Sequence, residues 1–440
     1  MELNGKRVMV IGLGASGLAA ARFLASRGAE LVMTDRRRDL DRSILPGGEL
    51  HLGEDDPAWL AGVGLLVTSP GVPPGAILLR EAAVRGIPVI GEIELAARFI
   101  DAPIAAITGT NGKSTVTVLL GDMLKAAGRR TFVGGNLGTP LIEAVGPYEA
   151  VVAEVSSFQL ESIDRFRPRV AIHLNLSDDH FDRYRGLDDY GAAKARIFEN
   201  QRADDFAILN RDDPLVWKLA RTVKSQVIAF SLERPGDGGS AIWLSGDRLE
   251  FHIGEKRGTL SIDQYRLAGR HNLQNAMAAA AAALVLDAGA SVIERALREF
   301  RGLPHRIALV REKDGVRYVD DSKATNVGAV LEALEAMRGP VILIAGGVDK
   351  GGDYAPLREV VQRKVKCAML NGAAREKIAH ALAGAAEIEV VTTFREAVEG
   401  AARRARAGDT VLLSPACSSF DQFKDYAERG RAFEELVRAL

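Results

Sequence analysis

The stretch from Thr108 to Thr115 constrains the fold of this chain more than any other part of its sequence. An apolar run that is typical of a buried strand precedes it, and a segment with helical spacing follows. In such a strand–loop–helix unit, backbone N–H groups face phosphate oxygens, Lys113 reaches the outer phosphates, and the hydroxyl of Ser114 or Thr115 can bind Mg²⁺. The loop is shorter than a general P-loop, because Gly109 lies only four residues before Lys113. The pattern predicts a parallel α/β sheet that binds nucleoside phosphates.

A second glycine-rich turn lies near the N-terminus, from Gly12 to Gly17. It also follows an apolar run and opens a helix, and Asp35 ends the next expected strand. Taken alone, this pattern is typical of a nicotinamide-dependent oxidoreductase. The same geometry serves any nucleoside diphosphate, and a tight turn without a ligand is a further alternative. Arg36 and Arg37 follow at the place where a ribose or base would lie, although surface charge also explains them.

The alternation of short apolar runs and helical patterns predicts three α/β domains in the 440 residues. Strands are expected at 6–11, 30–34, 65–68, 104–108, 150–155, 170–174, 316–319, 341–345, 366–370 and 410–413, with helices at 16–27 and 276–286 and a β-rich patch at 227–267. We expect a Rossmann-like domain at 1–91, a central P-loop domain at 92–302 and a second Rossmann-like domain at 303–440.

Composition excludes several classes of partner. The net charge is −1, which gives no reason to expect binding to nucleic acid or to a membrane surface. We find no signal-peptide pattern, and the longest apolar run, 276–286, is too short to span a bilayer. Two cysteines cannot build a disulfide framework. We therefore expect a cytoplasmic protein that does not insert into membranes.

Polar residues follow two further expected strands of the central domain. Glu154 ends one strand, and His180 lies among several acids in the stretch that follows another. Since ligands of open α/β sheets bind at the carboxyl ends of strands, we expect Glu154 to bind Mg²⁺ beside the phosphate loop. The alternatives are a capping or solvated role for Glu154 and a structural role for His180.

Lys194 lies on the apolar side of an expected helix, because Tyr190, Lys194, Ile197 and Phe198 follow helical spacing. Its ammonium could reach water along a packed stem. Alternatively, burial could lower the pKa of Lys194, and the neutral amine could react with CO₂ to give a carbamate that binds Mg²⁺. The residues alone leave both possibilities open.

Three loops of the third domain, at 320–326, 346–352 and 414–421, each follow an expected strand and are rich in glycine, hydroxyl groups and lysine. Together they suggest one anion-binding crevice. The amides of 271–275, where the Ala-rich helix begins, could contact a base or phosphate, or could cap the helix.

Together these motifs resemble the Mur ligase family, the ATP-dependent amino-acid ligases of peptidoglycan precursor synthesis, on which cell-wall biogenesis, cell shape and cell division depend. The resemblance covers essentially the whole chain and rests on 109–115, Glu154, 175–180, Lys194, 271–275 and 305–306, in the family's order. Within the family, 321–326 and 414–424 are most similar to members that add D-glutamate to a UDP-linked muramoyl-alanine. The resemblance implies an acyl-phosphate intermediate and release of ADP and phosphate. We also expect a monomer.

The resemblance also implies roles for individual residues. ATP would contact Gly109, Thr110, Asn111, Gly112, Lys113, Ser114, Thr115, Asn272, Arg306 and Asp321. Two Mg²⁺ ions would be held by Ser114, Glu154, His180 and a carbamylated Lys194. The UDP precursor would contact Gly14, Ala15, Ser16, Asp35, Arg36, Arg37, Gly71 and Asn136, with Arg36 departing from the family pattern. D-Glutamate would contact Thr325, Lys350, Ser419 and Phe420. The catalytic residues would be Lys113, His180, Lys194 and Lys323, with Lys323 beside the transferred phosphate.

Other functions compete with this interpretation. An oxidoreductase has no use for the second phosphate loop, and a folylpolyglutamate synthetase has no use for the N-terminal nucleotide-like domain. Another amino-acid ligase of the family and a non-catalytic ATP-binding scaffold are further alternatives. Because the motifs come from different domains, we expect domain closure to assemble the site.

Overall fold

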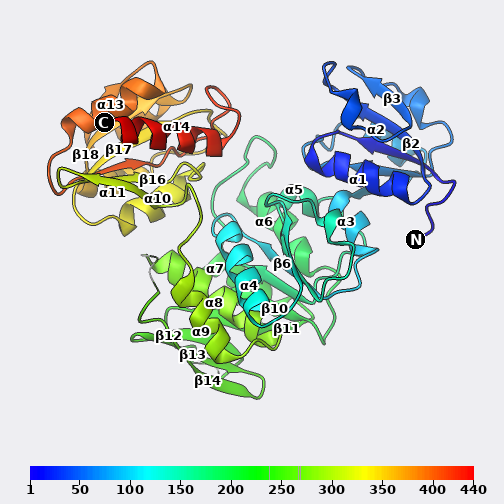
Figure 1. Ribbon diagram of the computed structural model, residues 1–440, viewed down its shortest axis with the longest axis horizontal. Coiled ribbons are helices and arrows are strands. Elements are labelled where there is room, and N and C mark those ends of the chain that lie inside the picture. The colour runs from blue at the N-terminus through cyan, green and yellow to red at the C-terminus, as the bar shows by residue number, and fades with distance from the viewer. Residues whose placement is uncertain (237, 266, 268) are drawn as a thin grey trace. The chain divides into compact units, whose positions relative to one another are not determined.

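Three β-sheets organise the chain in the computed structural model, which describes residues 1–236, 238–265, 267 and 269–440 (Figure 1). The residues cluster into two compact units. The first unit holds 1–175, 191–264 and 274–298, and the second holds 176–190, 265–273 and 299–440. The α/β fold class with parallel sheets is confirmed, whereas the expected domain boundaries at 91/92 and 302/303 stay predictions.

The N-terminal sheet is wholly parallel. Its strand order is β3 (Glu49–Leu52), β2 (Glu30–Asp35), β1 (Arg7–Ile11), β4 (Leu65–Thr68), β5 (Val89–Gly91). Its helices are α1 (Ala15–Ser26) and α2 (Ile77–Val84). Because the chain runs outward in both directions from β1, the loops after β1 and β4 meet at the carboxyl edge of the sheet, where a ligand crevice forms in folds of this kind.

The central sheet begins with parallel strands and ends in an antiparallel meander. Its order is β7 (Thr131–Gly135), β8 (Ala150–Glu154), β6 (Ile104–Thr108), β9 (Val170–His173), β10 (Phe206–Asn210), β11 (Gln226–Ser231), β12 (Ala241–Ser245), β13 (Arg248–Ile253), β14 (Lys256–Ser261). The associated helices are α4 (Lys113–Ala126), α5 (Ser157–Leu160), α6 (Leu187–Ala195), α7 (Pro214–Trp217), α8 (Arg270–Val285) and α9 (Ala290–Glu299).

The C-terminal sheet has an antiparallel edge pair and is otherwise parallel. Its order is β15 (Ala308–Lys313), β16 (Val316–Asp320), β20 (Thr410–Leu413), β17 (Val341–Gly346), β18 (Val365–Asn371), β19 (Glu387–Val390). The helices are α10 (Val327–Ala336), α11 (Leu357–Lys364), α12 (Arg375–Leu382), α13 (Phe394–Arg404) and α14 (Tyr426–Ala439). The last strand of the chain, β20, therefore lies inside the sheet.

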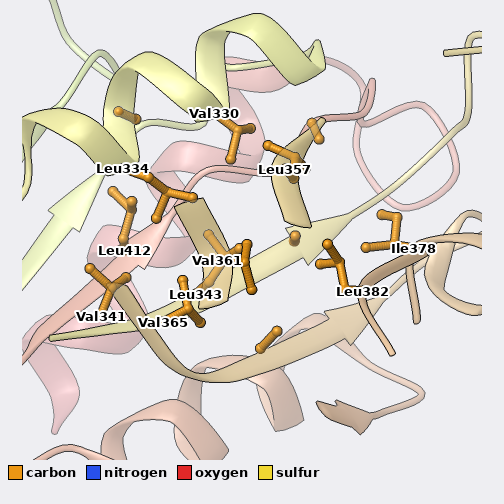
Figure 2. Close-up of a cluster of buried hydrophobic side chains, with 14 of the residues drawn as sticks. Val330, Leu334, Val341, Leu343, Leu357, Val361, Val365, Ile378, Leu382 and Leu412 are labelled. Atoms are coloured by element: carbon orange, nitrogen blue, oxygen red, sulfur yellow. The ribbon is translucent and has the colours of Figure 1, made fainter. Parts of the chain in front are cut away.

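Successive side chains of β17 pack into two different cores. Val341 and Leu343 belong to the core that α10, α11 and α12 cover, as Figure 2 shows. Ile342 and Ile344 belong to the opposite core, under α13 and α14. The two-residue period of a strand thus explains why this segment reads as a continuous apolar run.

A buried carboxylate anchors α3 (Glu92–Ala97) to the central domain. The side chain of Glu94 is fully buried and accepts hydrogen bonds from the backbone N–H groups of residues 164, 165 and 166 at 2.8–2.9 Å. Arg98 donates a further hydrogen bond at 2.7 Å. Since burying a carboxylate is costly unless it is hydrogen-bonded, this set of donors holds α3 in one position.

Most expected elements lie within two residues of their observed bounds, and those at 65–68, 104–108 and 410–413 have the expected bounds. The helix expected through Phe198 is wrong in its length. α6 ends at Ala195, and 196–198 form a 3₁₀ turn. Within the described ranges, every helix is too short or too polar to cross a membrane.

Replacing Glu94 tests the anchor of α3. Glu94→Ala removes the buried carboxylate that accepts from three backbone N–H groups and from Nε of Arg98, so we expect it to lower the free energy of unfolding by about 3 kcal/mol. The matched control is Glu81→Ala, since Glu81 forms an exposed i,i+4 pair with Arg85 and we expect a loss below about 0.5 kcal/mol. Urea unfolding measures the free energy of unfolding of both variants. An equal loss in the two variants would contradict the role of Glu94 in anchoring α3.

Candidate active site

The phosphate loop joins β6 to α4 in the first compact unit (Figure 1). Gly109 has φ +148°, and a Cβ there would lie 2.9 Å from Cβ of Leu174. Gly112 has φ +85°, and a Cβ there would lie 2.3 Å from Oδ1 of Asn275. Both positions therefore require glycine, for conformation and for space. The Nζ of Lys113 donates to the carbonyl oxygens of Gly109 and Thr110, each at 2.8 Å.

A buried group of oxygen ligands lies next to this loop. Ser114 Oγ donates to Oε2 of Glu154 at 2.6 Å, and Nδ2 of Asn136 donates to Oε1 of the same carboxylate at 2.8 Å. Ser114 and Glu154 are almost completely buried. The hydroxyl of Ser114, in α4, and the carboxylate of Glu154, at the end of β8, are oxygen ligands of the kind that Mg²⁺ prefers. Asn136, expected to contact the UDP precursor, lies in this group.

Lys194 is buried with 1% of its surface exposed, and its Nζ donates to the carbonyl oxygen of Gly109 at 2.8 Å. The alternative in which its ammonium reaches water is therefore wrong. Gly109 accepts from both Lys113 and Lys194. Two lysines thus converge on the backbone of the phosphate loop.

His173 was not recognised in the sequence as a residue of this region. It ends β9, between β6 and β10, and is 1% exposed. Burial, together with the positive charges of Lys194 and Lys113, lowers the pKa of His173 to about 3. In the described part of the chain its Nδ1 has no hydrogen-bond partner. A histidine within the apolar run 170–174 was the available sequence signal.

The N-terminal sheet carries a pocket of about 440 Å³ at the edge where β1, β2 and β4 end. Seven of the eight residues expected to contact the UDP precursor line it, and Asn136 does not. These seven are Gly14, Ala15, Ser16, Asp35, Arg36, Arg37 and Gly71. The tight turn beside the pocket depends on Gly17, where a Cβ would lie 1.8 Å from the carbonyl oxygen of Gly12.

Asp35 is held rigidly at the rim of this pocket. The backbone N–H of Leu13 donates to its Oδ2 at 2.6 Å, and the guanidinium of Arg37 donates to both carboxylate oxygens at 2.9 Å. Burial opposes ionisation, but these hydrogen bonds outweigh it and lower the pKa of Asp35 to about 2. Arg36 instead contacts Asp55 at 3.4 Å and is largely exposed.

A pocket of about 200 Å³ lies in the second compact unit. Lys350, whose Nζ lies 3.2 Å from Oδ1 of Asp179 and 3.4 Å from Oγ1 of Thr325, lines it. Of the four residues expected to contact D-glutamate, Thr325 and Lys350 line this pocket. Ser419 and Phe420 do not, since Ser419 is buried and Phe420 is 72% exposed.

Asn272, Arg306 and Asp321, expected to contact ATP, all lie in the second compact unit. Burial raises the pKa of Asp321 to about 7, against the hydrogen bond from Ser414 Oγ at 2.8 Å. Among the described residues, Nε of Arg306 is buried without a hydrogen-bond partner, and Asn272 is buried.

The two remaining expected catalytic residues also lie in this unit. Lys323 Nζ is 5.1 Å from the centre of the Tyr426 ring. His180 has a left-handed φ of +58°, and its Nε2 lies 3.7 Å from Oδ2 of Asp179. His180 and Lys194 belong to different compact units, so their sharing of one ion stays a prediction.

A pocket at the edge of one sheet, a glycine-rich loop with a buried carboxylate on the next and a pocket lined by a lysine in the second compact unit match the arrangement expected of a nucleotide-dependent ligase. Family models match along most of the chain. They are described as "Mur ligase MurD-like, N-terminal domain" at 6–91, "Mur ligase middle domain" at 107–283 and "Mur ligase, glutamate ligase domain" at 305–417.

Relatives match over the full length. A protein of Geotalea daltonii is 47% identical over 449 residues, covering 100% of this chain and 99% of the relative. One of Trichlorobacter lovleyi is 48% identical, covering 100% of both chains. Each is named UDP-N-acetylmuramoylalanine–D-glutamate ligase. The chain therefore belongs to the Mur ligase family, and it is an ATP-dependent ligase that forms amide bonds.

Solved structures agree on the fold. A pseudomurein peptide ligase type C from Methanothermus fervidus has a TM-score of 0.63 at 19% identity, covering 99% of this chain and 100% of that one. MurF from Acinetobacter baumannii has a TM-score of 0.63 at 18% identity, covering 98% and 93%. With the family established, the oxidoreductase interpretation of the turn at 12–17 falls away.

The geometry of Gly112 predicts its effect on nucleotide binding. Gly112→Ala places a methyl group against Asn275 at a positive φ, so we expect the loop to shift and the KM for ATP to rise at least about tenfold. The control is Gly128→Ala, since Gly128 has nearly the same φ, +84°, with no atom within 4 Å of the new Cβ. It should cost about 1 kcal/mol of stability and leave the KM for ATP unchanged. Equal KM values in both variants would contradict the steric argument.

His173 predicts how stability depends on pH. Its pKa is lowered in the folded chain, so the unfolded chain binds this proton more tightly. The stability that neutral His173 contributes is fully present above about pH 6.5 and is lost as the pH falls towards 3. Between pH 7 and 5, we expect the free energy of unfolding to fall by about 2 kcal/mol less in His173→Leu than in the wild type. Urea unfolding at both pH values measures this difference, and equal slopes would show that folding does not bury a neutral imidazole.

Proposed function

We propose that this protein joins D-glutamate to UDP-N-acetylmuramoyl-L-alanine in peptidoglycan precursor synthesis, with ATP converted to ADP and phosphate. The observation that carries the proposal is the match to relatives of that name, 44–48% identical over the whole of this chain. A pocket in the second compact unit, in which Lys350 can pair with a carboxylate, supports an acidic amino-acid substrate.

In the first step, a carboxylate oxygen of the precursor attacks the γ-phosphorus of ATP, and ADP leaves. The N–H groups of the loop at 109–112 and the helix start at Lys113 bind the nucleotide phosphates. The Nζ of Lys113, which lies against two loop carbonyls, swings towards the β- and γ-phosphates. These groups position the reactants and stabilise the charge that develops during transfer.

Ser114 and Glu154 fit a first Mg²⁺ ion, because their oxygens are buried, adjacent and of the type that this ion prefers. His180 and a carbamate on Lys194 would hold a second ion. When bound, Mg²⁺ would neutralise negative charge on the phosphates of ATP and on the γ-phosphoryl group that is transferred. The Nζ of Lys194 is buried and lies 2.8 Å from the carbonyl oxygen of Gly109, so a carbamate formed on it would carry its oxygens beside the phosphate loop.

In the second step, the amine of D-glutamate attacks the acyl carbon of the acyl phosphate, and phosphate leaves. Thr325 and Lys350 bind a carboxylate of the amino acid and so orient its amine. The amine loses a proton as the amide bond forms, and His180 accepts it if it does not bind metal. Lys323 lies near the departing phosphate.

The cellular setting follows from the substrates. We propose that the protein acts in the cytoplasm as a monomer. The domain at 1–91 binds the UDP precursor, 92–302 binds ATP, and 303–440 contributes to binding of ATP and the amino acid.

Phosphate release with purified UDP-N-acetylmuramoyl-L-alanine, ATP and Mg²⁺ tests the proposed function. We expect release with D-glutamate and little with L-glutamate, L-lysine or diaminopimelate. Release with ATP alone should be low, because the carboxylate of the precursor is the attacking group. A response to a different amino acid would overturn the D-glutamate assignment while leaving the ligase class intact.

The carbamate on Lys194 predicts a spectroscopic signal. Protein equilibrated with ¹³C-bicarbonate should give a carbamate signal in ¹³C NMR. Lys194→Arg should lack this signal and lose at least about a hundredfold in kcat, because its guanidinium forms no carbamate and cannot bind Mg²⁺. Lys125→Arg, on an exposed part of α4, is the control and should keep both. An unchanged signal in Lys194→Arg would place the carbamate elsewhere.

A further inference from the structure

The guanidinium of Arg429, on α14, is buried beneath the strand-end loops of the C-terminal sheet, with 3% of the residue exposed. Its Nε donates to Oγ of Ser322 at 3.0 Å, and its Nη2 donates to the carbonyl oxygens of Ser322 at 2.8 Å and Cys417 at 3.1 Å. Its Nη1 lies 3.5 Å from the carbonyl oxygen of Gly346. One side chain therefore contacts the loops that follow β16 and β20 and the last residue of β17.

Stability alone does not explain a charged group at this position. Within the described part of the chain, Arg429 forms no ion pair with a carboxylate, and burial lowers its pKa to about 10. Burying a charge is costly even where hydrogen bonds and the more distant carboxylates of Asp421 and Asp320 compensate it in part, and apolar side chains often replace buried charges without loss of stability. A planar guanidinium differs from an apolar group in one respect that matters here, since its donors have fixed directions and fix their acceptors in turn.

The three loops are also bonded directly to one another. The N–H of Ala416 donates to the carbonyl oxygen of Ala324 at 2.9 Å, and the N–H of Gly346 donates to that of Pro415 at 2.9 Å. Val348 forms an antiparallel bridge with Ser418. Arg429 therefore contacts a single connected layer of backbone.

This layer carries the side chains assigned to the amino acid. Thr325 lies three residues after Ser322, and Lys350 lies four residues after Gly346. Both line the pocket of the second compact unit. The layer has no spare room, since a Cβ on Gly347 would lie 2.1 Å from the carbonyl oxygen of Ser418 and 3.2 Å from Nη1 of Arg429. A shift of the guanidinium would therefore move the loops.

We propose that Arg429 is a positioning residue for the amino-acid subsite, whose guanidinium fixes the distance between the loops that carry Thr325 and Lys350. The inference rests on the proposed function only in placing the amino acid at these two residues. It concerns the geometry of the amino-acid subsite, and it does not depend on the phosphate loop or on the UDP-precursor pocket.

Steady-state kinetics of Arg429→Lys test the proposal. A lysine keeps the positive charge but has a single nitrogen, which cannot reach the acceptors on all three loops. We expect the KM for D-glutamate to rise roughly tenfold or more, with the KM for ATP and for the precursor within about twofold of wild type. The control is Arg431→Lys, an exposed residue of the same helix, which should change none of these values.

Ser322→Ala provides a second, milder variant in case Arg429→Lys does not fold. It removes the Oγ that accepts from Nε of Arg429 and leaves the guanidinium in place. A smaller rise in the KM for D-glutamate alone is expected. Thermal unfolding of every variant accompanies the kinetics, because a lower Tm with unchanged KM values would assign Arg429 a structural role only and overturn the proposal.

Two further outcomes are decisive. Full activity of Arg429→Lys at unchanged KM would mean that charge alone suffices, and the positioning role would be wrong. If wild-type protein uses another amino acid, the proposed function fails, and the same kinetics with the accepted amino acid still test Arg429. If wild type uses D-glutamate and only the Arg429 prediction fails, the inference alone is overturned.

Discussion

Strands that are buried on both faces can present polar groups only at their ends. In the C-terminal sheet, successive residues of β17 enter two separate hydrophobic cores, so neither face is available to a substrate. The same constraint applies to the parallel part of the central sheet, where every residue of β6 and β8 is buried. Glu154 ends β8, the phosphate loop follows β6, and Lys350 follows β17. These polar groups consequently lie at the carboxyl edges of their sheets, where ligands of α/β folds bind.

Several charged side chains that are buried or partly buried form hydrogen bonds with the backbone. Lys113 and Lys194 both donate to the carbonyl oxygen of Gly109, and Arg429 donates to carbonyl oxygens of two loops. Among the acidic side chains, that of Glu94 accepts hydrogen bonds from three consecutive backbone N–H groups. A side chain bonded to the main chain fixes the path of that main chain. Charge burial in this protein therefore determines loop geometry as well as electrostatics.

Much of the fold could be predicted from the sequence, because continuous apolar runs ended by glycine, serine or proline mark buried parallel strands. The strands at 65–68, 104–108 and 410–413 are of this kind. Shorter or more polar strands such as β3, β15 and β19 escaped prediction, since their burial patterns are mixed. Loop motifs likewise indicated the phosphate site and the three C-terminal loops.

The sequence could not predict which residues that are far apart in the chain form hydrogen bonds with each other in the site. Spacing placed Lys194 on an apolar stripe, but the acceptor of its Nζ lies 85 positions away in the chain. Arg429 shows the same signal, since it lies four and eight residues before the buried Phe433 and Val437. At such spacing, an arginine usually packs its aliphatic part against apolar side chains and keeps its guanidinium in water. Only the fold reveals the carbonyl oxygens that surround the guanidinium of Arg429.

The position of β20 has a consequence for folding. This strand lies between β16 and β17, yet it is synthesised after every other strand of its sheet. Until β20 pairs, β16 and β17 each have an unpaired edge, and α14, which follows β20, cannot yet cover the second core. In the other two sheets the strand that is synthesised last, β5 or β14, lies at an edge. Edge-to-edge association is therefore a greater hazard for the C-terminal sheet before β20 is in place.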